Sequence, residues 1–135
     1  MSFRIWLFLA GVSALLAVIA GAYSAHSLGG PNVTSGATKA FEVAQTFHMM
    51  HSIALFGLAA LLAATDSRRT AWASWMLQIA GFAFLAGIML FSGGIYYQVL
   101  GAVKSGVPLI PAGGISFMIG WTALALSVFG FRGNS

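Results

Sequence analysis

The chain has 135 residues, which is the size of a single domain. It is 59% hydrophobic and 6% charged, and it contains no cysteine, so disulfides, thiolate metal sites and thiol catalysis are excluded. The six basic residues give a net charge of +4 but are scattered along the chain. This pattern excludes the continuous basic patch of a nucleic-acid-binding protein.

Long apolar runs fill the chain, and the charged residues stand at the edges of these runs. About 20 apolar residues at a rise of 1.5 Å cross a hydrocarbon core about 30 Å thick. A charge at the bilayer centre costs at least about 2.5–3.5 kcal/mol, which explains its exclusion from the runs. The sequence therefore predicts an all-α integral membrane protein, in which residues 1–135 form one four-helix bundle with antiparallel neighbours. We expect the helices at about 4–27, 38–64, 70–100 and 111–131.

The first run, over residues 5–25, resembles a signal peptide in its start but exceeds the usual hydrophobic segment of about 7–15 residues. We therefore expect a retained membrane helix. Turn-forming residues follow at 28–36, and Ser35 or Thr38 is expected to cap the second helix. The short connection at 65–69 predicts that the second and third helices are antiparallel neighbours.

The third run is longer than a bilayer requires, so its helix is expected to extend beyond the core or to bend at residues 92–94. Pro111 suits the first turn of the fourth helix. Tryptophans are expected to border the bundle at the cytoplasmic interface. These are Trp6, Trp72 and Trp75.

Basic residues also predict the orientation. In a chain with four spans, the four arginines fall on one side of the membrane and the two lysines on the other. The positive-inside rule then places both termini in the cytoplasm. The arginines are Arg4, Arg68, Arg69 and Arg132, and the lysines are Lys39 and Lys104.

Small residues recur at alternating spacings of three and four in the first and fourth helices. Such stripes let membrane helices approach closely, so we interpret them as helix-packing surfaces. The first stripe is Ala10, Ala14, Ala17, Gly21 and Ser24, and the second is Gly113, Ser116, Gly120, Ala123, Ser127 and Gly130.

A polar face is predicted on the second helix, where four side chains lie within about 120° of one another. His51 is expected near the bilayer centre, with His48 about one turn shallower and Glu42 near the surface. Further polar residues are expected at the same, non-cytoplasmic end of the bundle. The complete candidate set is His26, Glu42, Gln45, His48, His51, Ser52, Tyr96, Tyr97 and Gln98.

Each histidine has two interpretations: interhelical hydrogen bonding, or ligand binding and proton relay. The sequence His48-Met49-Met50-His51 offers soft ligands that suit copper, although the methionines point away from the histidines on a regular helix. Histidines from two helices also suit haem iron. No nucleophile, base and acid occur together, so we expect no catalytic residues and no enzyme activity.

Motifs in all four predicted helices resemble those of domain-of-unknown-function family 423, the transmembrane protein 256-like family. The matching segments are residues 21–26 and 41–55, then 91–98, 111–114 and 120–125. This resemblance implies a four-helix protein of the bacterial inner membrane and implies no reaction. His26 and His51 correspond to histidines of the family motifs. His48 stands where other members can carry glutamine, and Ser24 where many have glycine.

Three functions are therefore open. The first is an accessory or assembly partner that packs in the lipid bilayer against other membrane subunits or against itself. The second is a protein that binds a metal, haem or quinone through its outer-half histidines. The third is a small transporter or proton pathway along the polar face.

Overall fold

The computed structural model describes residues 1–28, 34–101 and 108–132. Its long helices are α1 (Phe3–Ser27), α2 (Ser35–Ala64), α3 (Ala71–Gly87), α4 (Gly93–Leu100) and α5 (Ile110–Leu126). A π-helical turn, η2 (Ile88–Ser92), joins α3 to α4, so that one continuous helical rod runs over Ala71–Leu100. Two 3₁₀ turns, η1 (Asp66–Arg68) and η3 (Ser127–Gly130), lie at the other end of the bundle.

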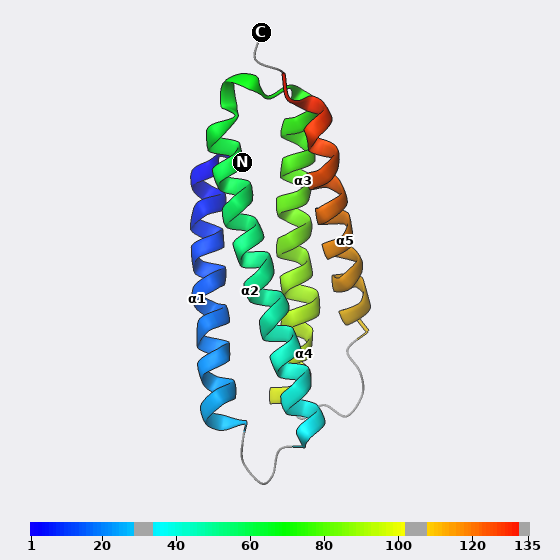
Figure 1. The fold of residues 1–135 in the computed structure, drawn as a ribbon. Helices are drawn as coiled ribbons and strands as arrows, with labels where there is room; N and C mark the ends of the chain where they lie inside the picture. Colours follow the sequence, from blue (N-terminus) through cyan, green and yellow to red (C-terminus); the bar gives the residue numbers. More distant parts are fainter. Residues whose placement is uncertain (29–33, 102–107, 133–135) are drawn as a thin grey trace.

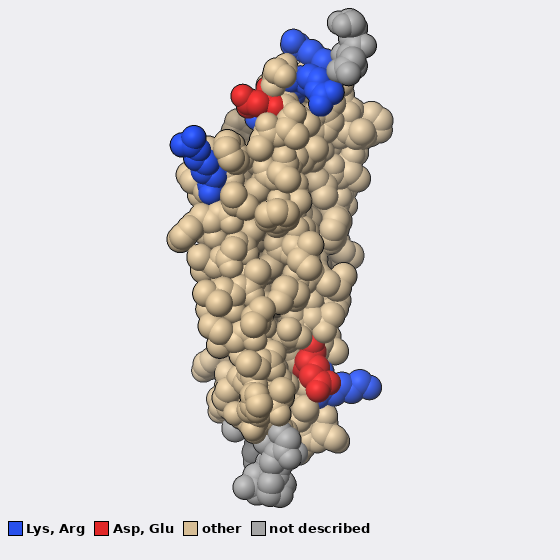
Figure 2. Space-filling model, turned by 60° about the vertical axis from the view of Figure 1, so that its left-hand side comes forward, with Lys and Arg blue, Asp and Glu red and all other residues tan. Residues whose placement is uncertain are grey.

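Among the described residues, four helical segments are long and apolar enough to cross a bilayer: Phe3–Ser27, Ser35–Ala64, Ala71–Leu100 and Ile110–Gly130. Their 21 to 30 residues correspond to about 31 to 45 Å of helix. The charged side chains gather at the two ends of the molecule, and an uncharged belt separates them (Figure 2). The predicted membrane-spanning, all-helical architecture is confirmed.

The predicted helix ends agree with the structure to within a few residues, but the predicted cap of the second helix is wrong. Thr34 is the N-cap of α2, and its hydroxyl accepts a hydrogen bond from the Ala37 amide at 3.3 Å. Ser35 is the first helical residue. Thr38 lies inside the helix, where its hydroxyl donates to the Leu28 carbonyl at 3.1 Å and so ties α2 to the end of α1. Lys104 lies outside the described residues.

The bundle consists of two helix pairs: α1 lies against α2, and α5 lies against α3 (Figure 1). Small residues form the contact surface in each pair. Ala10 and Ala17 of the first stripe are buried, and Ala14, Gly21 and Ser24 are half-buried. In the second stripe Ser116 is half-buried and the other five residues are buried. Both stripes therefore lie at interfaces inside the chain rather than on its outer surface.

Trp6 joins the two pairs. Its ring fills the space beside Gly81 of α3, where an added methyl group would lie 2.6 Å from the Trp6 Cζ2 atom. The indole Nε1–H donates to the Gln78 side-chain oxygen at 3.0 Å, and the ring contacts Phe82 edge-on at 5.2 Å. Trp6 is fully buried, so its ring faces the interior of the bundle rather than its outer surface. Trp72 and Trp75 are exposed.

The π-helical turn lies where the third span meets α2 and α5. The Ser92 hydroxyl, fully buried, donates to the Ala44 carbonyl of α2 at 2.8 Å. Gly113 of α5 packs directly against the backbone of Phe91. The helix is irregular at Ile88–Ser92, just before the two glycines where the sequence predicts a bend, and it continues as one rod to Leu100.

At the end of the bundle that carries η1 and η3, backbone and side-chain hydrogen bonds hold the α2–α3 connection against the end of the fourth span. The Thr70 amide and hydroxyl both donate to the Gly130 carbonyl, at 3.0 and 2.8 Å. The Arg69 guanidinium donates to the Leu62 carbonyl at 2.8 Å and to the Asp66 carboxylate at 2.9 Å. The short connection thus holds α2 and α3 as antiparallel neighbours, as the sequence predicts.

Candidate functional site

The polar centre of the molecule is a cluster of four side chains, which we call the His48 cluster: His48 and Ser52 of α2, Ser13 of α1 and Tyr96 of α4. The His48 Nε2 atom lies 3.2 Å from the Ser13 hydroxyl, which in turn lies 2.7 Å from the Ser52 hydroxyl. Ser52 donates to the His48 carbonyl at 2.8 Å. The Tyr96 hydroxyl lies 3.4 Å from His48 Nδ1. Three helices therefore meet at one histidine.

Counting donors fixes the direction of every bond in this cluster. The Ser52 proton goes to the His48 carbonyl, so the proton between the two serines must come from Ser13. The Ser13 oxygen then accepts from His48, which places the ring proton on Nε2. Nδ1 is left as an acceptor, and Tyr96 donates to it over a long distance. The cluster is thus satisfied with a neutral histidine.

His51 lies about 60° around α2 from His48 and bonds to a different helix. Its Nδ1–H donates to the Phe47 carbonyl at 2.8 Å, and its Nε2 accepts from the indole N–H of Trp121 at 3.2 Å. The ring stacks on Phe117 with centroids 3.6 Å apart. The predicted polar face of the second helix is therefore divided: Gln45, His48 and Ser52 face α1, whereas His51 faces α5.

The hydrogen bonds of the two histidines bear on whether either ring could ligate haem iron or another metal ion. Both ring nitrogens of His48 and of His51 are engaged with protein groups, so binding a metal would break existing hydrogen bonds. Met50 is exposed and Met49 half-buried, and neither lies in the His48 cluster. Within residues 1–28, 34–101 and 108–132, no three histidine, cysteine or acidic side chains are grouped as a metal site requires.

The other predicted site residues lie apart from this cluster or at its margin. Gln45 lies between α2 and α1, where its side-chain amide donates to the Ala17 carbonyl of α1 at 3.4 Å. Glu42 is exposed on α2, near Lys39. His26 is exposed in the last turn of α1, Tyr97 is exposed on α4, and Gln98 is half-buried there.

Two residues that bond to these histidines were not predicted: Ser13 and Trp121. A serine in an apolar helix gives a weak signal, although Ser13 lies between Ala10 and Ala17 on the surface that faces α2. Trp121 is 47% exposed, so one edge of its ring faces lipid while its N–H reaches His51. Neither contact could be inferred without knowing which helices are neighbours.

The geometry of His51 predicts the result of two substitutions. His51→Leu removes the hydrogen bond from Trp121 and the stack on Phe117, and should lower the free energy of unfolding by about 1–2 kcal/mol. His51→Phe keeps an aromatic ring and should cost less. The thermal midpoint of each purified variant in the same detergent measures both effects. Equal midpoints for wild type and His51→Leu would contradict a structural role.

Comparison with known proteins is consistent with this fold. A family profile described as protein of unknown function (DUF423) matches residues 20–114. A UPF0382 membrane protein of Staphylococcus aureus strain bovine RF122 is 33% identical over 130 residues, which cover 96% of this chain and 99% of the relative. A UPF0382 membrane protein of Staphylococcus epidermidis strain ATCC 35984 is 32% identical over the same shares. No solved structure matches the chain. The chain therefore belongs to the DUF423 family of membrane proteins.

Proposed function

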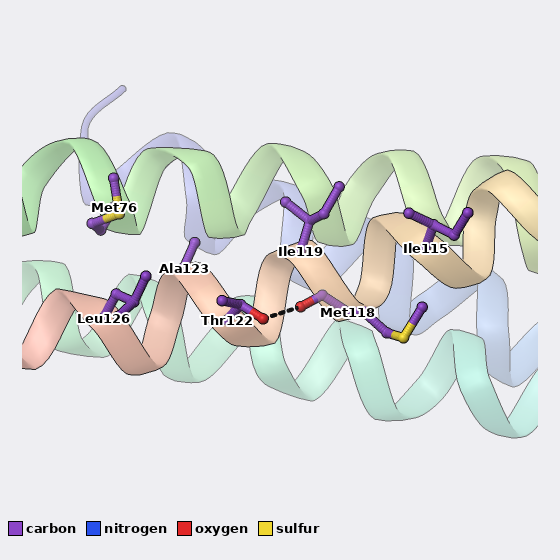
Figure 3. Close-up of a pocket in the computed structure, with 7 residues that line it drawn as sticks. All are labelled: Met76, Ile115, Met118, Ile119, Thr122, Ala123 and Leu126. Atoms are coloured by element: carbon purple, nitrogen blue, oxygen red, sulfur yellow. Dashed lines mark hydrogen bonds between the residues drawn. The ribbon is translucent and has the colours of Figure 1, made fainter.

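We propose that this protein is a non-enzymatic accessory protein that acts by packing against transmembrane helices, with a second copy of the chain as its simplest partner. The observation that supports this function is an apolar groove on the outer face of α3 and α5. Its volume is about 280 Å³, and it is lined by Met76, Ile115, Met118, Ile119, Thr122, Ala123 and Leu126 (Figure 3).

The groove has the form of a helix-docking surface. The α5 residues Ile115, Ile119, Thr122 and Leu126 follow the spacing of one helix face, and Met76 of α3 lies across from them. Met76 and Met118 can adapt to a partner because their side chains are unbranched and flexible. The Thr122 hydroxyl already donates to the Met118 carbonyl at 2.8 Å, so the surface offers shape rather than hydrogen bonds.

The polar groups of the described bundle also favour a packing role. Every buried side-chain nitrogen or oxygen among the described residues has a hydrogen-bond partner, so the interior polar groups hold the helices together. On the arginine side of the His48 cluster, Trp6, Leu58, Leu77 and Phe84 fill the centre of the bundle and are each at most 1% exposed. A transport pathway would have to cross this packed layer.

The distribution of basic residues and the source of the relatives support a location for the protein. The arginines of the described chain flank the end formed by the start of α1, the η1 connection and the residues after η3, and Lys39 stands at the other end. This asymmetry favours both termini in the cytoplasm. The relatives named above come from bacteria. We therefore propose the bacterial inner membrane as its location.

The mass of the protein in a mild detergent tests this function. We expect purified wild type to contain more than one chain, or to co-purify with a membrane subunit. Ile119→Trp should reduce that mass to one chain, because the larger side chain fills the groove. Ile53→Trp is the matched control: Ile53 is 62% exposed on α2, outside the groove, and its substitution should leave the mass unchanged.

Light scattering coupled to size-exclusion chromatography gives the mass without the detergent contribution. A wild-type protein that is strictly monomeric and retains no other subunit would overturn the proposed function. Retention of the wild-type mass in Ile119→Trp would place the partner contact elsewhere than in the groove.

A further inference from the structure

A second groove lies between α1 and the rod formed by α3, η2 and α4, and it shares no lining residue with the α3–α5 groove. Its volume is about 250 Å³. Val12 and Leu16 of α1 and Met89 of η2 form its rim and are 40%, 53% and 73% exposed, so the groove opens toward the lipid chains. Its lining also includes Ser13, His48 and Tyr96.

An apolar groove with three polar side chains in its lining is the usual composition of a small-molecule site. Ser13 of α1 and His48 of α2 lie well inside their spans, where a buried polar group must form its hydrogen bond with protein or ligand. The Tyr96 ring is held in place by Phe41, with ring centroids 4.6 Å apart. Its hydroxyl is the weakest-bound member of the His48 cluster, at 3.4 Å from His48 Nδ1.

The π-helical turn is an independent sign of a site. Such turns are rare and frequently occur at functional positions in helices. In this protein the turn contributes Ile88 and Met89 to the groove. Gly93 and Tyr96, in the helix that continues from the turn, also line it. Gly93 has no side chain, and a methyl group added there would meet only the Ile88 carbonyl, at 3.7 Å. The glycine therefore keeps the groove open.

Hydrogen-bond capacity selects the ligand. A ligand hydroxyl can donate to His48 Nδ1 and accept from the Tyr96 hydroxyl, so that it replaces one long bond by two bonds of normal length. A ligand carbonyl or ether can only accept, which would leave Nδ1 unpaired once Tyr96 turns to the ligand. Aromatic rings at the polar end of the groove favour an aromatic head. The small volume admits the head alone, with an apolar tail among the lipids.

We propose that this groove binds a membrane-soluble phenol, a lipophile whose head is a hydroxylated aromatic ring, through Tyr96 and His48. The site is distinct from the α3–α5 groove, so binding and assembly are separate properties of the chain.

Equilibrium binding of radiolabelled 4-decylphenol to the full chain in nanodiscs, corrected with empty nanodiscs, tests the proposal. We expect saturable binding of one molecule per chain. The methyl ether 4-decylanisole should bind about fivefold to tenfold more weakly, because it loses the donated hydrogen bond. Decan-1-ol, which has the hydroxyl without the ring, should also bind more weakly.

Three variants assign the binding to this groove. Gly93→Leu should fill it and abolish saturable binding while the thermal midpoint stays at or above that of wild type, since a side chain has room there and leucine favours helix. Tyr96→Phe should bind 4-decylphenol about fivefold more weakly and 4-decylanisole as before. Tyr97→Phe, at an exposed neighbouring tyrosine, should change neither affinity.

The proposal is overturned by non-saturable partitioning, by equal affinities for the phenol and its methyl ether, by equal affinities for the phenol and decan-1-ol, or by unchanged saturable binding in folded Gly93→Leu. None of these results would alter the mass measured in detergent, so the test is independent of the assembly function.

Discussion

Replacement of Trp6 with alanine is expected to lower the free energy of unfolding by about 3 kcal/mol or more, the largest loss among single substitutions in the α1–α3 contact. Trp6 is fully buried, and its ring lies against Gly81 and Phe82 of α3. The substitution leaves a cavity where α1 meets the α3–α5 pair, and the Gln78 side chain loses its indole donor. Thermal unfolding of the purified variant, followed by near-ultraviolet circular dichroism, measures the loss.

Trp75→Ala is the matched control. Trp75 has the same side chain on α3 but is 68% exposed, so its removal should shift the thermal midpoint much less. If the two variants had equal midpoints, Trp6 would not join the helix pairs. A Trp6→Phe variant should fall between wild type and Trp6→Ala, because it keeps part of the ring packing and loses the hydrogen bond.

The membrane architecture could be predicted because it depends on local sequence. Charge is excluded from each span by the bilayer itself, so the positions of Arg4, Lys39, Asp66 and Arg132 mark the ends of helices without reference to their neighbours. The short connection at residues 65–69 likewise makes α2 and α3 antiparallel neighbours. These inferences needed only helix length and the polarity of the surroundings.

The interior polar contacts could not be predicted in full, because they depend on which helices are neighbours. His48 and His51 are three residues apart and share one face by helical geometry, yet they hydrogen-bond to different helices. The partner of each histidine depends on where α1 and α5 lie relative to α2. His26, a candidate from the same reasoning, is exposed at the end of α1.

Trp6 shows a second limit of sequence reasoning. Tryptophan near a helix end is typical of the membrane interface, and Trp72 and Trp75 are exposed as that rule leads one to expect. Trp6, near the start of α1, is buried instead, because Gly81, on a helix far away in sequence, leaves room for its ring. The π-helical turn at Ile88–Ser92 is a similar case, since its buried Ser92 donates to the Ala44 carbonyl on α2.

Gly113→Ala is expected to destabilise the protein, whereas Gly114→Ala should be neutral or stabilising. Alanine favours a helix over glycine by about 1 kcal/mol, so local propensity predicts a gain at both positions. At Gly113, however, the added methyl group would contact the Phe91 amide nitrogen and lie 2.7 Å from its Cβ and 2.8 Å from its Cα. These atoms belong to the π-helical turn and cannot move alone, so a loss of about 1–3 kcal/mol outweighs the gain.

At Gly114 an added methyl group would have no atom within 4 Å, so only the gain in propensity remains. The two variants carry the same substitution at adjacent positions. In one detergent, the thermal midpoint of Gly113→Ala should lie below that of wild type, and that of Gly114→Ala at or above it. A stabilised Gly113→Ala variant would show that α5 does not approach Phe91 closely. The small-residue stripe of the fourth span includes Gly113 and omits Gly114, so the same pair of variants tests whether that spacing identifies the helix interface.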